Sequence, residues 1–229
     1  MSDGTESEIH MPPAATDLYA AALQSVRSDE VAGSRPWSVR DHDGRAFPLA
    51  GALDRWTGRA DAVDRRFLGR ARGTVLDIGC GPGRLAAELA RTGVHALGLD
   101  ISPAALRLAR RSGATVIQRS VFEPVVAEGL WGTALLADGN IGIGGDPTVL
   151  LRRCRSLLAP DGLVLVETER PGAGLRTTRL RLERVDAVSA WFDWAEVGCD
   201  AVEELAGSAG LHPSETWQDG GRWFVALRR

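Results

Sequence analysis

The sequence predicts an α/β protein built on a mostly parallel sheet with helices on both faces. From Gly73 onward, short apolar runs typical of buried strands alternate with amphipathic segments typical of helices. The first run ends at Asp77 and leads into a glycine-dense turn, and the second ends at Asp100. Strands separated by helices must run parallel, because each helix carries the chain back across the sheet.

The first 71 residues lack this alternation. Residues 1–16 are polar, contain Pro12-Pro13 and are expected to form a disordered tail. Residues 17–71 are expected to form an N-terminal cap. Its predicted elements are a helix from Asp17 to about Val26, a hairpin around Asp43-Gly44 and a second helix from about Leu53 to Arg70.

Residues 72–229 are predicted to form the α/β domain. Ser102 and Asp146 precede prolines at positions where a helix accepts them, so both are expected to cap helices. The expected strands are 74–78, 94–99, 114–118, 133–138, 162–167 and a final one in 221–229; the expected helices are 84–92, 103–111, 147–158 and 200–209. An insertion at about 169–198 includes 177–183, which alternates apolar and charged residues like an edge strand.

Composition excludes several classes of function. The formal net charge is -3, which gives no global field favouring nucleic acid, so no nucleic-acid partner is expected. All 27 basic residues are arginine, which excludes a Walker lysine and a Schiff-base lysine. The three cysteines are widely spaced and form neither a disulfide framework nor a metal motif. No apolar run is long enough to cross a membrane and no signal-peptide core is visible, so we expect a cytoplasmic protein without a membrane partner.

The glycine-dense turn distinguishes between possible ligands. Its glycines lie at Gly79, Gly81 and Gly83, whereas a dinucleotide fingerprint needs G-x-G-x-x-G and would have its third glycine at Arg84. Asp77 stands two residues before the first glycine and would repel a pyrophosphate. The same carboxylate would attract a ligand that carries an ammonium group, directly or through water.

The segment from Thr74 to Leu85 closely resembles motif I of class I S-adenosylmethionine-dependent methyltransferases. Asp100 lies 21 residues past Gly79, close to the distance usual for a carboxylate that binds ribose hydroxyls. The resemblance covers about residues 72–168 and is strongest at these two places. It implies a Rossmann-like class I methyltransferase fold, with a seven-stranded sheet that ends in an antiparallel hairpin. It also implies S-adenosyl-L-methionine as the cofactor.

The resemblance places the cofactor at the carboxyl ends of four strands, where ligands bind in open α/β sheets. Many family members carry an acidic residue where this chain has Ser120, so the adenine contact would fall to the serine hydroxyl or to nearby backbone. The expected cofactor-binding residues are Asp77, Gly79, Cys80, Gly81, Gly83, Asp100, Ile101, Ser120, Val121, Phe122, Ala137 and Asp138.

A second glycine-rich loop follows the fourth strand, from Gly139 to Gly145. Glycines permit positive φ angles and close approach of backbone to a ligand, so this loop is expected beside the transferable methyl group. Asp138 and Asn140 are expected to face the reaction space there. The alternative is a plain flexible connector.

The acceptor is expected between the cap and the insertion. Trp56, Trp191 and Trp194 would line a pocket for a planar or apolar acceptor, with Trp37 nearby; the alternative is that these rings are core residues. His42 would be a general base only if the hairpin folds over the site, and a solvated turn is the competing interpretation. No nucleophile–base pair is found, and the catalytic residues stay unassigned.

The predicted function is S-adenosylmethionine-dependent methyl transfer to a small-molecule acceptor, such as a secondary metabolite, by in-line SN2 displacement. Two alternatives stay open: a protein of the same fold that uses the cofactor for a non-methylating reaction such as cyclisation, and an NAD- or nucleotide-sugar-dependent oxidoreductase. Nucleic-acid and protein methyltransferases are disfavoured, because neither a basic stripe nor a recognition module is visible. The sequence does not identify the acceptor or the oligomeric state.

Overall fold

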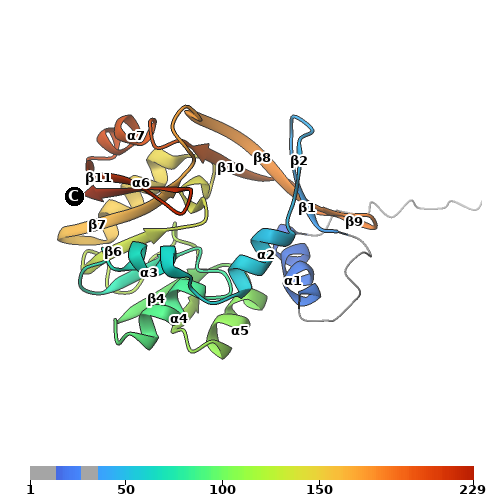
Figure 1. The fold of residues 1–229 in the computed structure, drawn as a ribbon, viewed down its shortest axis with the longest axis horizontal. Helices are drawn as coiled ribbons and strands as arrows, with labels where there is room; N and C mark the ends of the chain where they lie inside the picture. Colours follow the sequence, from blue (N-terminus) through green and yellow to red (C-terminus); the bar gives the residue numbers. More distant parts are fainter. Residues whose placement is uncertain (1–13, 27–35) are drawn as a thin grey trace, which may run out of the picture.

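The computed structural model describes residues 14–26 and 36–229 of the chain. Its main sheet has seven strands in the order β11-β12-β7-β6-β3-β4-β5 (Figure 1). Five of them, from β7 to β5 in this order, pair with one another in parallel, and β12 runs antiparallel to both of its neighbours. The strands are β3 Val75–Ile78, β4 Ala96–Asp100, β5 Val116–Gln118, β6 Trp131–Leu136, β7 Leu158–Thr168, β11 His212–Asp219 and β12 Arg222–Arg228. The predicted fold class, including the terminal antiparallel hairpin, is confirmed.

Helices cover both faces of this sheet. Ser102 and Asp146 cap two of them as predicted, accepting hydrogen bonds from the N–H groups of Ala105 (3.3 Å) and Val149 (3.0 Å). One core joins one face of the sheet to α6 and α7, and another joins the opposite face to α3 and α4. The helices of this domain are α4 Arg84–Arg91, α5 Pro103–Arg111, α6 Pro147–Leu157 and α7 Val202–Ser208, with a short 3₁₀ turn, η1, at Asn140–Gly142.

The fourth parallel strand is displaced from its predicted position of 133–138. It begins at Trp131 and ends at Leu136. Asp138 and Gly139 have φ angles of 54° and 81°, which no strand accommodates, so the chain turns at this point. The turn leads directly into η1.

The cap and the insertion combine into a second sheet, which the sequence did not predict. Its order is β10-β8-β1-β2, with β9 paired to β8. In Figure 1, β8 extends from the main sheet to the hairpin. The predicted edge strand at 177–183 therefore lies inside a sheet, because β1 covers its free edge. The strands are β1 Ser38–Asp41, β2 Ala46–Pro48, β8 Leu175–Arg184, β9 Ala187–Val188 and β10 Phe192–Val197.

The cap helices are α1 Ala15–Ser25, α2 Ala50–Thr57 and α3 Ala62–Leu68. The single helix predicted from Leu53 to Arg70 was wrong: it is two helices. The chain leaves the helical conformation at Gly58, and Asp61 begins a new helix through a capping box with Asp64. In that box Asp61 Oδ1 accepts from the Asp64 N–H at 2.7 Å, and Asp64 Oδ2 accepts from the Asp61 N–H at 3.0 Å.

Of the tail predicted at 1–16, residues 1–13 lie outside the described part of the chain. The prediction was wrong for Ala15 and Thr16, which already belong to α1. Within the described ranges, no helix combines the length and the apolar character needed to cross a bilayer.

Candidate functional site

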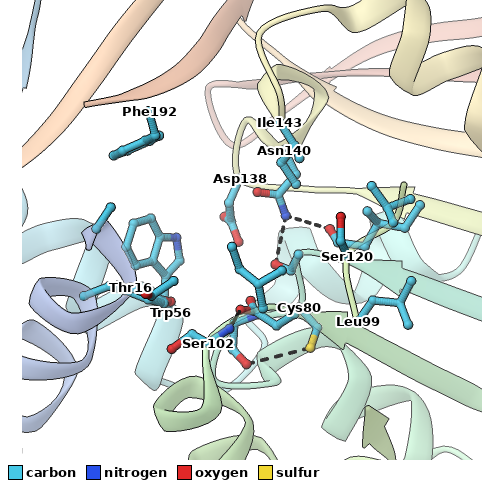
Figure 2. Close-up of a pocket in the computed structure, with 18 of the residues that line it drawn as sticks. Thr16, Trp56, Cys80, Leu99, Ser102, Ser120, Asp138, Asn140, Ile143 and Phe192 are labelled. Atoms are coloured by element: carbon cyan, nitrogen blue, oxygen red, sulfur yellow. Dashed lines mark hydrogen bonds between the residues drawn. The ribbon is translucent and has the colours of Figure 1, made fainter. Parts of the chain in front are cut away.

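A cavity of about 570 Å³ lies between the carboxyl ends of the parallel strands and the second sheet. Figure 2 shows side chains entering it from several sides, with Phe192 and Trp56 far from Leu99 and Ser120. All but two of the predicted site residues line it. They are Trp56, Asp77, Gly79, Cys80, Gly81, Asp100, Ile101, Ser120, Val121, Phe122, Ala137, Asp138, Asn140 and Trp194.

Gly83 is one of the two residues that lie outside the cavity. It precedes α4 with φ 85°, and a Cβ placed there would be 2.6 Å from the Ala109 Cβ. The glycine therefore lets the start of α4 pack closely on α5, instead of contacting a ligand. Gly79 (φ 70°) and Gly81 (φ 54°) do line the cavity, in left-handed conformations that favour glycine.

Asp77 is the penultimate residue of β3, and its carboxyl group is buried at the cavity. Its Oδ2 atom is buried and has no hydrogen-bond partner in the described structure. Burial raises the pKa of Asp77 to about 7, and the Arg84 guanidinium partly opposes this. A buried carboxylate oxygen without a partner is costly, so the site fits a ligand that brings a cationic hydrogen-bond donor.

Asp100 ends β4 and is held by backbone donors. Its two carboxylate oxygens accept from the N–H groups of Gly81 (2.9 Å) and Ser102 (2.7 Å). Burial nevertheless raises its pKa above the ordinary value. A carboxylate offers about four acceptor positions, so these two bonds orient the group and leave lone pairs for a ligand's hydroxyls.

Asp138 lies between two arginines. Arg84 donates to its two oxygens at 2.6 and 2.9 Å, and Arg55 of α2 approaches Oδ1 at 2.8 Å. Its backbone N–H donates to Glu167 Oε2 at 2.8 Å. The left-handed backbone of Asp138 is thus fixed by charge-assisted bonds from the cap helix α2 and from α4.

The same network continues away from the cavity. Arg222 of β12 grips Glu167 with two bonds of 2.7 Å and reaches Asp64 Oδ1 at 2.8 Å. Arg84 also pairs with the buried Asp64. Burial opposes ionisation of Asp64, yet the bonds from Arg84 and Arg222 lower its pKa to about 2. The guanidinium of Arg84 is therefore already paired with protein carboxylates and is not available to bind a ligand phosphate.

The second glycine loop lines the cavity with Asn140, Ile143 and Gly144, and it also packs closely on the rest of the fold. Asn140 lines the cavity, but its amide donates to the carbonyl oxygens of Ile78 (2.8 Å) and Gly79 (2.9 Å) and so braces the first turn. A Cβ on Gly142 would overlap the Ala195 carbonyl oxygen and lie 2.8 Å from Trp194 Nε1. The absence of a side chain at Gly142 therefore allows close packing of the loop on β10.

Aromatic side chains close the cavity from the cap and from β10. Tyr19 of α1 meets Trp56 of α2 edge to face at 6.0 Å, and Phe192 meets Trp194 in the same way at 6.3 Å. Trp191 is the second predicted site residue outside the cavity. Strand alternation places its ring on the opposite face of the sheet from Phe192, where Arg181 lies 4.5 Å from the ring centroid.

The structure does not place His42 in the cavity. Its Nδ1 is 3.0 Å from Thr178 Oγ1 and its Nε2 is 3.3 Å from Asp43 Oδ1, so it packs at the hairpin turn. The cavity also holds residues that sequence reasoning missed. The alternation at 177–183 was a usable signal for Leu180 and Leu182, whereas nothing in the sequence marked Tyr19. Burial raises the pKa of the Tyr19 hydroxyl, and nearby Asp100 adds to this.

Comparison with known proteins connects this geometry to one family. Residues 54–198 match the profile of a family described as "Methyltransferase domain". A ubiquinone biosynthesis O-methyltransferase from Cereibacter sphaeroides is 29% identical over 150 residues, which cover 61% of this chain and 60% of that relative. The chain thus matches less than two thirds of the length of this curated relative.

Solved structures show the same fold over nearly the whole chain. An S-adenosylmethionine-dependent methyltransferase from Bacteroides fragilis, in complex with S-adenosyl-L-homocysteine, has a TM-score of 0.76 and 22% identity, covering 95% of this chain and 97% of that one. A 1,6-didemethyltoxoflavin-N1-methyltransferase from Burkholderia thailandensis has a TM-score of 0.57 and 21% identity, covering 99% and 98%.

Proposed function

The chain belongs to the methyltransferase domain family, and from this premise we propose that it transfers the methyl group of S-adenosylmethionine to a small-molecule acceptor. The observation that carries the proposal is the unpartnered, buried Oδ2 of Asp77 at the edge of a cavity that also contains Asp100. One carboxylate suits an ammonium group and the other suits a ribose diol. An adenosyl amino acid carries both groups.

Different residues around the cavity would bind different parts of the cofactor. Asp77 would hold the amino group of the cofactor, Asp100 the ribose hydroxyls, and Ser120 with Phe122 the adenine end. When bound, S-adenosylmethionine supplies a methyl group on a sulfonium, which a nucleophilic acceptor atom displaces in line. The protein's part is then to align the acceptor and to exclude water, and alignment alone is worth about 7–11 kcal/mol in favourable models.

Among the described residues, two candidate bases are either engaged in ion pairs or distant from the cavity. The carboxylate of Asp138 is bonded to Arg84 and Arg55, and His42 lies elsewhere. We therefore propose that the acceptor atom is nucleophilic enough to react once it is placed in line. A non-methylating reaction on the same cofactor stays the second candidate, because binding residues alone do not distinguish the two.

Binding of the cofactor is tested by calorimetry with S-adenosylhomocysteine and with NAD. We expect S-adenosylhomocysteine to bind and NAD not to bind. Asp100→Ala should weaken binding by about tenfold or more, because the diol loses a charged acceptor. Because Asp100 also holds the Gly81 and Ser102 N–H groups, the thermal midpoint of the variant is measured alongside. Unchanged affinity in a folded variant would refute the assigned role.

Methyl transfer itself is tested by product analysis. The protein is incubated with methyl-labelled S-adenosylmethionine and a panel of small aromatic acceptors. Label in the acceptor, together with release of S-adenosylhomocysteine, supports the proposal. The non-methylating candidate would be favoured if an acceptor is converted only when the cofactor is present, while the label stays on the cofactor.

A further inference from the structure

One end of the cavity is apolar and is built from the cap and the insertion. Figure 2 shows Phe192 on the opposite side of the cavity from Ser102. We use the name acceptor chamber for the end lined by Val39, Leu49, Trp56, Leu180, Leu182 and Phe192. Four of these six side chains belong to β1, β8 and β10 of the second sheet.

Strand alternation keeps positive charge out of this chamber. Val39 pairs with Leu182 on the inner face, and the next pair in register, Arg40 with Arg181, points to the outer face. Arg179 likewise lies on the outer face, with its guanidinium 6.0 Å from the centroid of the Trp191 ring. Its partner in register, Asp193 of β10, also lines the cavity, so the charged residue that the second sheet adds to the cavity is an anion. The second sheet therefore presents an apolar face to the chamber and a face rich in arginine to the outside.

Arg176 shares the inner side of β8 but does not reach the cavity. It is bound by Asp41, by Asp43 at 2.9 Å and by Glu196 at 3.0 Å. Its charge is thus satisfied within the sheet. It is not available to an acceptor.

Two arginines line the cavity, but neither places a free positive charge in the acceptor chamber. Arg84 is committed to Asp64 and Asp138. Arg119 follows β5 at the far end, with Glu123 3.9 Å away. The chain has no lysine, so the described residues offer the chamber no cation. An anionic group entering it would be desolvated without a partner, which is strongly unfavourable.

The two edge-to-face aromatic pairs, Tyr19–Trp56 and Phe192–Trp194, lie on different walls of the cavity. Flat rings favour flat ligands, because a planar molecule buries most area against them. We propose that the acceptor is an uncharged, planar ring compound and that the acceptor chamber excludes ring compounds bearing a carboxylate. This inference rests on the proposed function only in calling the bound ring the acceptor.

The proposal is tested with two ring compounds that differ by one carboxylate. The full-length protein, loaded with S-adenosylhomocysteine at neutral pH, is dialysed to equilibrium against 2-naphthol or 6-hydroxy-2-naphthoate. We expect 2-naphthol to bind at least about tenfold more tightly, which corresponds to about 1.4 kcal/mol. Equal binding, tighter binding of the naphthoate, or no binding of either compound would overturn the proposal.

Two neighbouring residues of opposite orientation provide matched variants. Phe192→Arg places a cation in the chamber and should tighten naphthoate binding by about tenfold or more relative to 2-naphthol. Trp191→Arg adds the same charge on the outer face and should leave the ratio of the two affinities unchanged. Equal effects of the two variants would contradict a role for the chamber. If Phe192→Arg does not fold, the relative affinities of the wild-type protein for 2-naphthol and 6-hydroxy-2-naphthoate still test the proposal.

Failure of this inference is separable from failure of the proposed function. Cofactor binding is measured on its own by calorimetry, and the two naphthalene compounds are also compared on the protein without S-adenosylhomocysteine. If the protein discriminates between the two compounds but does not bind S-adenosylhomocysteine, the inference about the chamber stands and the assigned cofactor is refuted. A protein that binds S-adenosylhomocysteine without discriminating loses only the chamber's selectivity.

Discussion

Asp77 illustrates how a single residue combines a proposed role in cofactor binding with a cost to stability. Its side chain lies near the end of β3 inside the protein, where Oδ2 lacks a hydrogen-bond partner among the described residues. Burial raises its pKa to about 7, so near neutral pH it exchanges between a neutral and a charged form. Only the charged form can neutralise an ammonium group. Cofactor binding should therefore depend on the proton of this one carboxyl group.

We expect the affinity for S-adenosylhomocysteine to rise about tenfold between pH 6 and pH 8, because Asp77 loses its proton in this interval. Asp77→Asn should bind more weakly and should lose this dependence, so it also controls for titration of the ligand. Calorimetry across the pH range measures both. The same pH dependence in wild type and variant would exclude Asp77 as its source.

The same pKa shift predicts how stability changes with pH. The unfolded chain releases the Asp77 proton near 3.8, whereas the folded protein keeps it to about 7. Between these values the folded state binds more protons, so stability falls as pH rises through the interval. Asp77→Asn should remove a fall on the order of a few kcal/mol. Urea unfolding without ligand at pH 5 and pH 8 tests this, and a variant no more stable than wild type at pH 8 would contradict it.

Among the elements, η1 and the glycine loop around it depend on close packing with a neighbouring strand. The loop is held from one side by β10 and from the other by the bonds of Asn140 to the first turn. A sequence rich in glycine suggested contact with a ligand, because glycine permits close approach to any partner. Here the partner of Gly142 is the backbone of another strand.

Gly142→Ala should destabilise the protein by about 1–3 kcal/mol, because the new methyl group would overlap the Ala195 carbonyl oxygen. Gly207→Ala is the matched control. It lies in α7 with nothing within 4 Å of the added Cβ, so it should be neutral or slightly stabilising. The midpoint of urea unfolding reports both changes. Equal effects at the two positions would show that the predicted overlap is relieved at little cost.

The whole molecule is held together around the cavity by contacts between segments distant in the chain. The hairpin strand β1 pairs with β8, and Arg55 of α2 reaches Asp138 and Glu167 at the ends of β6 and β7. Cap, insertion and α/β domain thus contribute walls to one cavity. A substitution in the cap should therefore change the affinity for the cofactor.

We expect Arg55→Met to weaken binding of S-adenosylhomocysteine by about threefold to tenfold, because α2 loses its ion pairs and Asp138 loses one of two arginines. The loss of stability should stay small, near 1 kcal/mol, since the guanidinium is partly exposed. Arg59→Met is the control, because Arg59 is exposed and forms no ion pair with the described residues. Calorimetry and thermal unfolding separate the two effects, and equal affinities of both variants would disprove the coupling.

The resemblance to class I methyltransferases implied the seven-stranded sheet. The sequence by itself determined the α/β class, most helix boundaries and the residues at the strand ends. These follow from local periodicity, caps and glycine spacing, and parallel strands bring their carboxyl ends together without further information. Only the tertiary structure decided which surfaces face the cavity. The pairing of β8 with β1 and with β10 places Leu180, Leu182 and Phe192 on the inner face and Trp191 on the outer face. The two partners of Arg84, Asp64 and Asp138, come from separate segments distant in the chain. Such contacts depend on strand register and on charges far apart in the chain, which no local pattern encodes.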